Sequence, residues 1–144
     1  FSKAWASAAM RLGVSYASQE IIEIYNKVKY PYNINILTQR QALKVLDDIE
    51  NIKRITAEIL DARNQLVAEL AMIDEVEKIF PSDANFVLVQ VKNANALYAF
   101  LRDNGVIVRN RSRVNLCGNC LRITVGSDEE NKLLIEQIQE YGTR

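Results

Sequence analysis

The pattern of hydrophobic positions predicts one long amphipathic helix in the middle of the chain, over residues 50–71. Within it, apolar residues recur every three or four positions and charged residues fill most of the gaps. This spacing places the apolar side chains on one face of a helix. They are Ile52, Ile55, Ile59, Ala62, Leu66 and Leu70. Because an average helix has only about 11 residues, we expect this one to be a spine with other elements packed on one side.

Four shorter helices are predicted from their boundaries. One covers residues 19–29 and ends before Pro31, since a proline disfavours helical conformation in the residue before it. A second opens at Thr38 and runs to residue 46. A third follows the capping residue Asn93 and ends at residues 104–105, Asn-Gly. The last begins with the capping box Ser127 to Glu130, with these side chains expected toward the core: Leu133, Leu134, Ile138 and Tyr141.

Five strands are predicted, over residues 12–17, 76–80, 86–91, 106–109 and 121–125. The third is a near-continuous apolar run, which indicates burial on both faces. The fifth alternates, so Leu121, Ile123 and Val125 share one face while Arg122 and Thr124 share the other. Strands and helices alternate along the chain, and the predicted fold class is α/β.

Composition excludes several classes of function. The 144 residues include 18 basic and 18 acidic side chains, and no basic stripe indicates a nucleic-acid partner. No apolar run approaches the roughly 20 residues of a membrane span. Histidine is absent, so catalysis or metal binding through histidine is excluded within this chain. No metal site is expected.

The two cysteines, Cys117 and Cys120, form a C-x-x-C pair. Such a pair is found in redox sites and as half of a zinc site. A second C-x-x-C is missing, and no βαβ redox context precedes the pair. We therefore expect two free thiols.

The first thirteen residues consist mainly of small side chains and contain two basic ones, Lys3 and Arg11, with no acidic residue before Glu20. A lysine without a nearby carboxylate can lose its proton when it is desolvated, which makes Lys3 a candidate amine nucleophile. Arg11 offers a planar fork to a phosphate. The alternatives are a solvated surface lysine and a surface ion pair of Arg11 with Glu20 or Glu23.

These residues begin a longer resemblance. Ser2 and Lys3, an aromatic residue and the run Ala8-Ala-Met-Arg-Leu-Gly13 resemble the cofactor-lysine segment of fold-type I pyridoxal-phosphate aminotransferases, above all the histidinol-phosphate aminotransferase branch. Four further segments follow in that family's order and at similar spacing. They are Lys29-Tyr-Pro-Tyr-Asn-Ile-Asn35, Pro81-Ser-Asp-Ala-Asn-Phe86, Gly105-Val-Ile-Val-Arg109 and Cys120-Leu-Arg-Ile-Thr-Val-Gly126. The resemblance covers essentially the whole chain, and five motifs in order are a specific signal.

The resemblance implies a domain organisation. The chain is short for this family and starts with Phe1, so we interpret it as the C-terminal part of a longer polypeptide. Residues 1–35 would be the end of the large cofactor-binding domain, and residues 36–144 the small C-terminal α/β domain. The boundary near Asn35 rests on the family and on the break at Pro31.

The resemblance also assigns roles near the beginning of the chain. Lys3 would bond covalently to pyridoxal 5'-phosphate and move the substrate's Cα proton. Ser2 and Arg11 would hold the cofactor phosphate. The family usually has glycine near Ala6 and near Ala9, so this chain carries extra methyl groups there.

Two arginines are implied as substrate-binding residues. Arg122 matches the arginine that binds the substrate α-carboxylate, a task for a bidentate and always charged donor. Arg109 matches an arginine that meets the substrate phosphate in the histidinol-phosphate branch. The alternatives to a binding role are a solvated charge on the exposed face of a strand for Arg122 and a charge that protects an edge strand from aggregation for Arg109. Arg111 and Arg113 are expected to be solvated.

The implied activity is pyridoxal-phosphate-dependent amino transfer between histidinol phosphate and 2-oxoglutarate or glutamate, in histidine biosynthesis. An aromatic aminotransferase and a phosphothreonine-type decarboxylase of the same fold are alternatives. A third is a non-catalytic fragment that binds no cofactor, and the chain alone is expected to be inactive. The full-length protein is expected to be a cytoplasmic homodimer without nucleic-acid or membrane partners.

Overall fold

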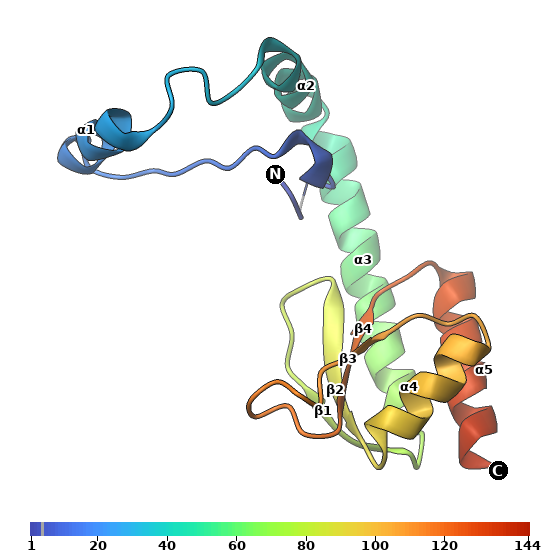
Figure 1. The fold of residues 1–144 in the computed structure, drawn as a ribbon. Helices are drawn as coiled ribbons and strands as arrows, with labels where there is room; N and C mark the ends of the chain where they lie inside the picture. Colours follow the sequence, from blue (N-terminus) through green and yellow to red (C-terminus); the bar gives the residue numbers. More distant parts are fainter. Residues whose placement is uncertain (4) are drawn as a thin grey trace. The chain divides into compact units, whose positions relative to one another are not determined.

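The computed structural model describes residues 1–3 and 5–144, and they form two compact units. The first comprises residues 1–56 and the second residues 57–144. Figure 1 labels the helices and strands along the chain. No helix among the described residues is long and apolar enough to cross a membrane. The predicted boundary near Asn35 concerns the domains of a longer protein and stays a prediction.

The unit of residues 1–56 contains mostly helices. They are the short 3-10 helix η1 (Ala8–Met10), α1 (Gln19–Val28), α2 (Ile36–Asp47) and the first part of α3 (Ile49–Leu70). Helix α2 begins two residues before the predicted start at Thr38. The reason is that the Asn35 side chain caps the helix by accepting a hydrogen bond of 2.9 Å from the Thr38 backbone N–H.

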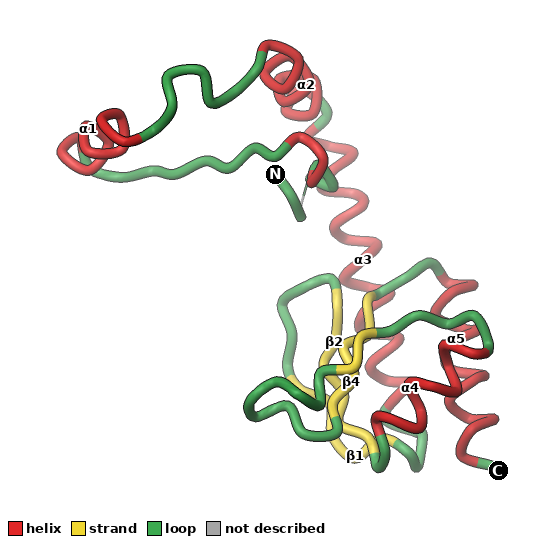
Figure 2. Tube along the Cα trace, in the orientation of Figure 1, coloured by secondary structure: helices red, strands yellow, loops and turns green. Residues whose placement is uncertain are grey.

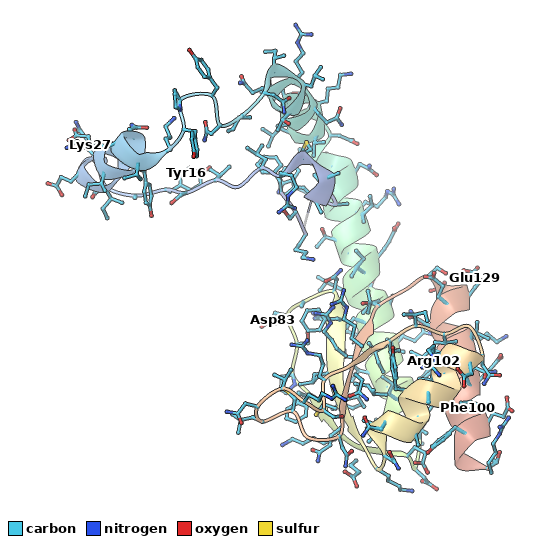
Figure 3. The ribbon with its side chains drawn as sticks, in the orientation of Figure 1. Tyr16, Lys27, Asp83, Phe100, Arg102 and Glu129 are labelled. Atoms are coloured by element: carbon cyan, nitrogen blue, oxygen red, sulfur yellow. The ribbon has the colours of Figure 1, made fainter. Side chains whose placement is uncertain are left out.

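The predicted strand over residues 12–17 is wrong, because residues 11–18 are irregular in the structure. A strand needs a neighbour for its backbone groups, and all four strands in the described part of the chain lie in the other unit. Tyr16 in this segment is 94% exposed, and Figure 3 labels it together with Lys27 of α1. Helix α1 is confirmed, but none of its residues is buried.

The unit of residues 57–144 is built on a four-stranded antiparallel sheet. Its strands are β1 (Val76–Phe80), β2 (Phe86–Val91), β3 (Arg109–Asn110) and β4 (Cys120–Thr124), in the order β1-β2-β4-β3. Figure 2 shows these strands in yellow and the helices in red. Helix α4 (Ala94–Asp103) connects β2 to β3, and α5 (Asp128–Gly142) follows β4. The fold class expected from the sequence, a mixture of helices and sheet, is confirmed.

The core of this unit lies between one face of the sheet and the helices. Val87, Val89 and Val91 of β2 are buried, and so are Leu121 and Ile123 of β4. The helices contribute Leu66 and Leu70 of α3, Leu97 and Leu101 of α4, and Leu134, Ile135 and Ile138 of α5. Predicted burial of β2 on both faces is wrong, since its residues alternate between half-buried and buried. The described helices pack on one face, which leaves the second face partly open.

The predicted strand over residues 106–109 is also shorter than expected, with only Arg109 paired at its end. The preceding residues instead close helix α4. Gly105, at φ 81°, donates to the carbonyl of Arg102 at 3.1 Å, and Val106 donates to that of Leu101 at 2.8 Å. This pair of bonds is a Schellman motif, in which a left-handed residue satisfies the last carbonyls of a helix.

The beginning of α5 has the predicted capping box. The Ser127 hydroxyl accepts from the Glu130 backbone at 3.3 Å, and the Glu130 carboxylate accepts from the Ser127 backbone at 2.8 Å. The buried Asn131 side chain bonds both the N–H and the carbonyl of Gly126. A Cβ at Gly126 would lie only 2.8 Å from the Glu130 Cβ. These contacts fix the connection from β4 into α5.

One expectation for α5 is wrong. Leu133 is 45% exposed, whereas Ile135 is buried. The buried stripe is Asn131, Leu134, Ile135 and Ile138, and this places Leu133 at its margin. Toward the end of the helix, Tyr141 contacts Phe100 of α4 with ring centroids 5.5 Å apart.

Candidate active site

Arg109 and Arg122 lie directly opposite one another in the sheet. They are paired residues of the antiparallel strands β3 and β4. Opposite residues of an antiparallel pair project from the same face, with Cβ atoms about 4.5–5.5 Å apart. Two like charges in these positions destabilise a sheet unless an anion compensates them. Neither arginine has an ion pair among the described residues.

Arg122 lies on the partly open face of the sheet, as its alternation in β4 predicted. It is paired with Leu88 of β2 on one side and with Arg109 on the other. Its guanidinium carbon lies 4.9 Å from the centroid of the Phe86 ring. Its Nε is buried and has no acceptor within the described part of the chain. An unsatisfied buried donor costs about 1–3 kcal/mol, so an acceptor at this guanidinium would be favourable.

Arg109 is exposed and lines a surface cleft of about 640 Å³. Asn95 and Tyr98 of α4 form one side of this cleft, and residues 107–111, 113 and 114 form the other. It therefore contains three arginines: Arg109, Arg111 and Arg113. No acidic residue of the described chain lines it. A cleft of this charge can accept an anionic group.

The loop after β3 is held by Asn110. Its side-chain amide donates 2.8 Å to the Asn95 side chain, and its side-chain oxygen accepts 2.9 Å from the Ser112 backbone. These bonds fix the backbone on both sides of Arg111. They bring α4 and the loop together at the cleft that Arg109 lines.

Lys3 is exposed and has no ion pair among the described residues. Its backbone carbonyl accepts from Ala6 at 2.9 Å, and the Phe1 carbonyl accepts from Ser7 at 3.1 Å. These bonds bring Ala6 back to Lys3 and Ser7 back to Phe1. Ser2 is half-buried.

Arg11 is exposed and follows directly on η1. Its Nη1 donates 2.8 Å to the carbonyl of Ala8, which leaves further N–H groups of the guanidinium available. The ion pair with Glu20 or Glu23, considered as an alternative, does not occur in the structure. Both Arg11, at φ 51°, and Ala6, at φ 48°, have left-handed backbones. Ala6 is one of the two positions where the family that this segment resembles has glycine nearby.

Comparison with known proteins connects this geometry to a family. A sequence model of the aminotransferase class I and II family matches residues 1–138. The chain belongs to this family. The histidinol-phosphate aminotransferase of Christiangramia forsetii is 50% identical over 97% of this chain and 40% of its own length. That of Parabacteroides distasonis is 48% identical over 96% of this chain and 40% of its own length.

A solved structure gives the same result for the fold. The crystal structure of histidinol-phosphate aminotransferase from Sinorhizobium meliloti in complex with pyridoxal-5'-phosphate matches with a TM-score of 0.80. It is 25% identical, and the match covers 97% of this chain and 39% of that one. The chain thus spans about 40% of the length of the curated relatives it matches. The predicted membership of the aminotransferase family and the fold of its C-terminal part are confirmed.

The predicted site residues fall into two groups within the described chain. Ser2, Lys3 and Arg11 belong to the unit of residues 1–56, whereas Arg109 and Arg122 belong to the unit of residues 57–144. Within the second unit the two arginines are brought together by strand pairing.

Two residues at the candidate site were given no role from the sequence. Phe86 was placed only in a family motif and at the start of a predicted strand, and Asn110 only next to the predicted strand over residues 106–109. The near-continuous apolar run of this strand did not show which face Phe86 lies on, and its contact with Arg122 depends on β2 and β4 being neighbours. Asparagine next to a strand end is a signal for loop-fixing hydrogen bonds.

The residues present fit a pyridoxal phosphate group by their chemistry. A free amine at Lys3, a hydroxyl at Ser2 and a guanidinium with spare donors at Arg11 are the donor types that an aldehyde and a phosphate need. The membership of the aminotransferase family and the relative solved with this cofactor agree with that fit.

Proposed function

We propose that the full-length protein containing this chain is a pyridoxal-phosphate-dependent aminotransferase that exchanges an amino group between histidinol phosphate and 2-oxoglutarate. The observation that carries the proposal is the pairing of Arg109 with Arg122 without any carboxylate partner in the described residues. Two opposed guanidinium groups suit substrates that are anionic. The names of the relatives support the choice of histidinol phosphate.

Arg122 would bind the α-carboxylate of glutamate or 2-oxoglutarate. A guanidinium gives a carboxylate two parallel hydrogen bonds. The Phe86 ring against one face of the guanidinium would limit its rotation, and the buried Nε adds a donor without an acceptor. Such preorganisation lowers the entropy lost when the substrate binds.

Arg109 would bind the phosphate of histidinol phosphate. It is the arginine that both lines the basic cleft and is paired with Arg122. A phosphate placed there would compensate the like charges of the pair. This assignment makes Arg109 selective for the phosphorylated substrate, whereas Arg122 serves the carboxylate substrate.

Ser2 and Arg11 would hold the cofactor phosphate, and Lys3 would bond to the cofactor aldehyde. When bound, the cofactor supplies an electron sink for the electrons of the substrate's Cα–H bond. The Lys3 amine would take the Cα proton and return it during the transfer, as a general base and acid. Since Lys3 is exposed in the described chain, the enclosure that desolvates it would come from other parts of the full-length protein.

The test is an assay of the full-length protein with each substrate separately. Arg109→Ala should reduce kcat/KM for histidinol phosphate about tenfold to hundredfold, because a charge-assisted bond is worth about 1.5–3 kcal/mol. The same change should affect glutamate much less. Arg113→Ala, which removes an equal charge from the same cleft, is the matched control and should have little effect on either substrate.

Other outcomes decide between the alternatives. Equal losses for phosphorylated and unphosphorylated substrates would remove the phosphate role and favour an aromatic aminotransferase. Release of carbon dioxide from phosphothreonine would favour the decarboxylase. Borohydride reduction of the full-length protein with cofactor should label Lys3, and labelling at another lysine would overturn its assignment. Cytoplasmic localisation and a homodimer stay predictions from the family.

A further inference from the structure

The loop between β3 and β4 is a chain of three consecutive turns. The backbone N–H of Val114 donates to Arg111 at 2.8 Å, that of Cys117 to Val114 at 3.0 Å, and that of Cys120 to Cys117 at 3.1 Å. The N–H of Arg111 also donates to the Cys120 carbonyl at 2.8 Å, which closes the loop. Each turn spans four residues. The two cysteines are therefore the first and last residues of the final turn.

This turn brings the two cysteines into the range of a disulfide. A hydrogen-bonded β-turn holds its first and last Cα atoms within about 7 Å, and disulfides usually join Cα atoms about 4.4–6.8 Å apart. Asn119, the third residue of this turn, has a left-handed backbone at φ 52°, as the third residue of a type II turn does. The Cys120 thiol lies 3.4 Å from the Gly118 carbonyl, so the sulfur is directed back over the turn.

The two thiols differ in their surroundings. Cys117 is partly exposed, whereas Cys120 is buried, and neither is in a disulfide. Burial raises the pKa of the Cys120 thiol, and the neighbouring Cys117 raises that pKa further. Because the thiolate is the reactive form, an external disulfide should react first at Cys117. Cys120 is then the thiol placed to attack the mixed disulfide.

We propose that Cys117 and Cys120 are a reversible dithiol–disulfide site that exchanges with small-molecule disulfides of the glutathione type. The Cys117 thiolate attacks one sulfur of the external disulfide, and one glutathione leaves as the thiol. Cys120 then attacks the Cys117 sulfur, the second glutathione leaves, and both cysteine protons are transferred to the leaving thiolates. The cysteine pair is oxidised by two electrons and the external disulfide is reduced by two.

The position of the pair connects this chemistry to the sheet. Cys120 is the first residue of β4, paired with Gln90 of β2, and it lies two residues before Arg122 on the same strand. A disulfide would fix the last turn of the loop that joins the strands of Arg109 and Arg122. The inference depends on the turn and the two thiols, and it does not rest on the proposed aminotransferase activity.

The experiment uses the folded 144-residue chain and defined mixtures of oxidised and reduced glutathione. Free thiols are blocked after equilibration, and the chain is cut by trypsin. Cleavage after Arg113 and Arg122 leaves both cysteines in one peptide, residues 114–122. We expect this peptide to lose two hydrogens without gaining glutathione, and to return to the dithiol form when reduced glutathione is in excess.

The same titration in urea measures how much the folded turn contributes to the stability of the disulfide. We expect the exchange equilibrium constant to favour the disulfide at least about tenfold more in the folded chain than in the unfolded one, which corresponds to about 30 mV. Equal constants, or a weaker disulfide in the folded chain, would overturn the proposal. So would mixed disulfides that persist on both cysteines, or links only between chains.

Two single variants separate the roles of the thiols. Cys120→Ser should leave Cys117 with a glutathione adduct that does not resolve. Cys117→Ser should leave Cys120 protected until the chain is unfolded. If Cys120→Ser fails to fold, Cys120→Ala gives the same readout at Cys117 without a buried hydroxyl. Rapid modification of Cys120 in folded Cys117→Ser would show that the assigned order of reaction is wrong.

Discussion

The guanidinium carbon of Arg122 lies 4.9 Å from the centroid of the Phe86 ring, across the β2–β4 ladder. A cation over an aromatic face is stabilised by about 0.5–2 kcal/mol, and the ring also restricts how the guanidinium can turn. If Arg122 binds a carboxylate, Phe86 is a positioning residue for that contact.

Replacing Phe86 by leucine in the full-length enzyme should raise KM for glutamate about fivefold, which corresponds to a loss of about 1 kcal/mol. The kcat at saturating glutamate should change little, because Arg122 itself is retained. Phe86→Tyr keeps the ring and should restore the KM. Steady-state kinetics with glutamate and with histidinol phosphate separate this effect from a general loss of folding.

A matched control is available in the same sheet. Phe80 of β1 has a similar contact with a cation, since Lys78 Nζ lies 4.8 Å from its ring centroid. Phe80→Leu removes an equivalent ring from a strand that is not adjacent to Arg122. It should leave the KM for glutamate unchanged, and an equal rise in both variants would contradict the assigned role of Phe86.

Ala6→Gly should stabilise the unit of residues 1–56. Ala6 has φ 48°, and a left-handed backbone costs an alanine about 1 kcal/mol that glycine avoids. Trp5 is the single tryptophan of the chain and lies next to this position. Urea unfolding followed by its fluorescence should therefore shift to higher denaturant. Ala9→Gly is the control, because Ala9 lies in η1 without a positive φ, and it should be neutral or destabilising.

Ser127→Ala should lower the free energy of unfolding of the unit of residues 57–144 by about 1 kcal/mol, since it removes the cap of α5. Ser112→Ala is the control in the same unit. The Ser112 hydroxyl is buried and has no partner in the described chain, so its removal should be neutral or slightly stabilising. Urea unfolding monitored by circular dichroism compares them, and equal losses would show that the cap contributes nothing specific.

Glu129 should stabilise the unit of residues 57–144 at neutral pH, and this contribution should be lost in acid. Its backbone N–H, and then the Ser127 hydroxyl at 2.8 Å, lower the pKa of the Glu129 carboxyl below its usual range. The ionised Glu129 carboxylate is therefore more stable in the folded chain than in the unfolded chain. Its contribution is complete above the ordinary glutamate pKa of about 4.3, and it is lost as the pH falls through the lower folded value. Glu129→Gln should flatten this part of the stability–pH curve, and an unchanged slope would contradict the explanation.

Elements set by local interactions could be predicted from the sequence. Helix α3 was expected over residues 50–71 and occurs at Ile49–Leu70, because its apolar spacing is uninterrupted. The capping box of α5 and the cap of α4 by Asn93 involve residues only three positions apart. Their geometry is determined by a few neighbouring side chains.

Features that depend on distant residues could not be predicted in this way. Whether β2 is buried on one face or two depends on where α3, α4 and α5 pack. The strand expected over residues 12–17 does not form, because the described residues of its unit contain no strand with which it could pair. The site residues Arg109 and Arg122 were named from family motifs, but their direct pairing follows from the register of β3 and β4.

The close contact between Gly126 and Glu130 means that substitutions at these two positions depend on one another. A Cβ at Gly126 would lie 2.6 Å from the Glu130 Oε2 and 2.8 Å from its Cβ. The glycine is thus required by the Glu130 side chain, including its Cβ, and its backbone φ is not the reason. Because alanine at position 130 would keep the Cβ contact, a change at position 126 can persist only after Glu130 has been replaced by glycine or the backbone between the two residues has moved. Substitutions at these two positions should therefore occur in a fixed order, with position 130 changing first.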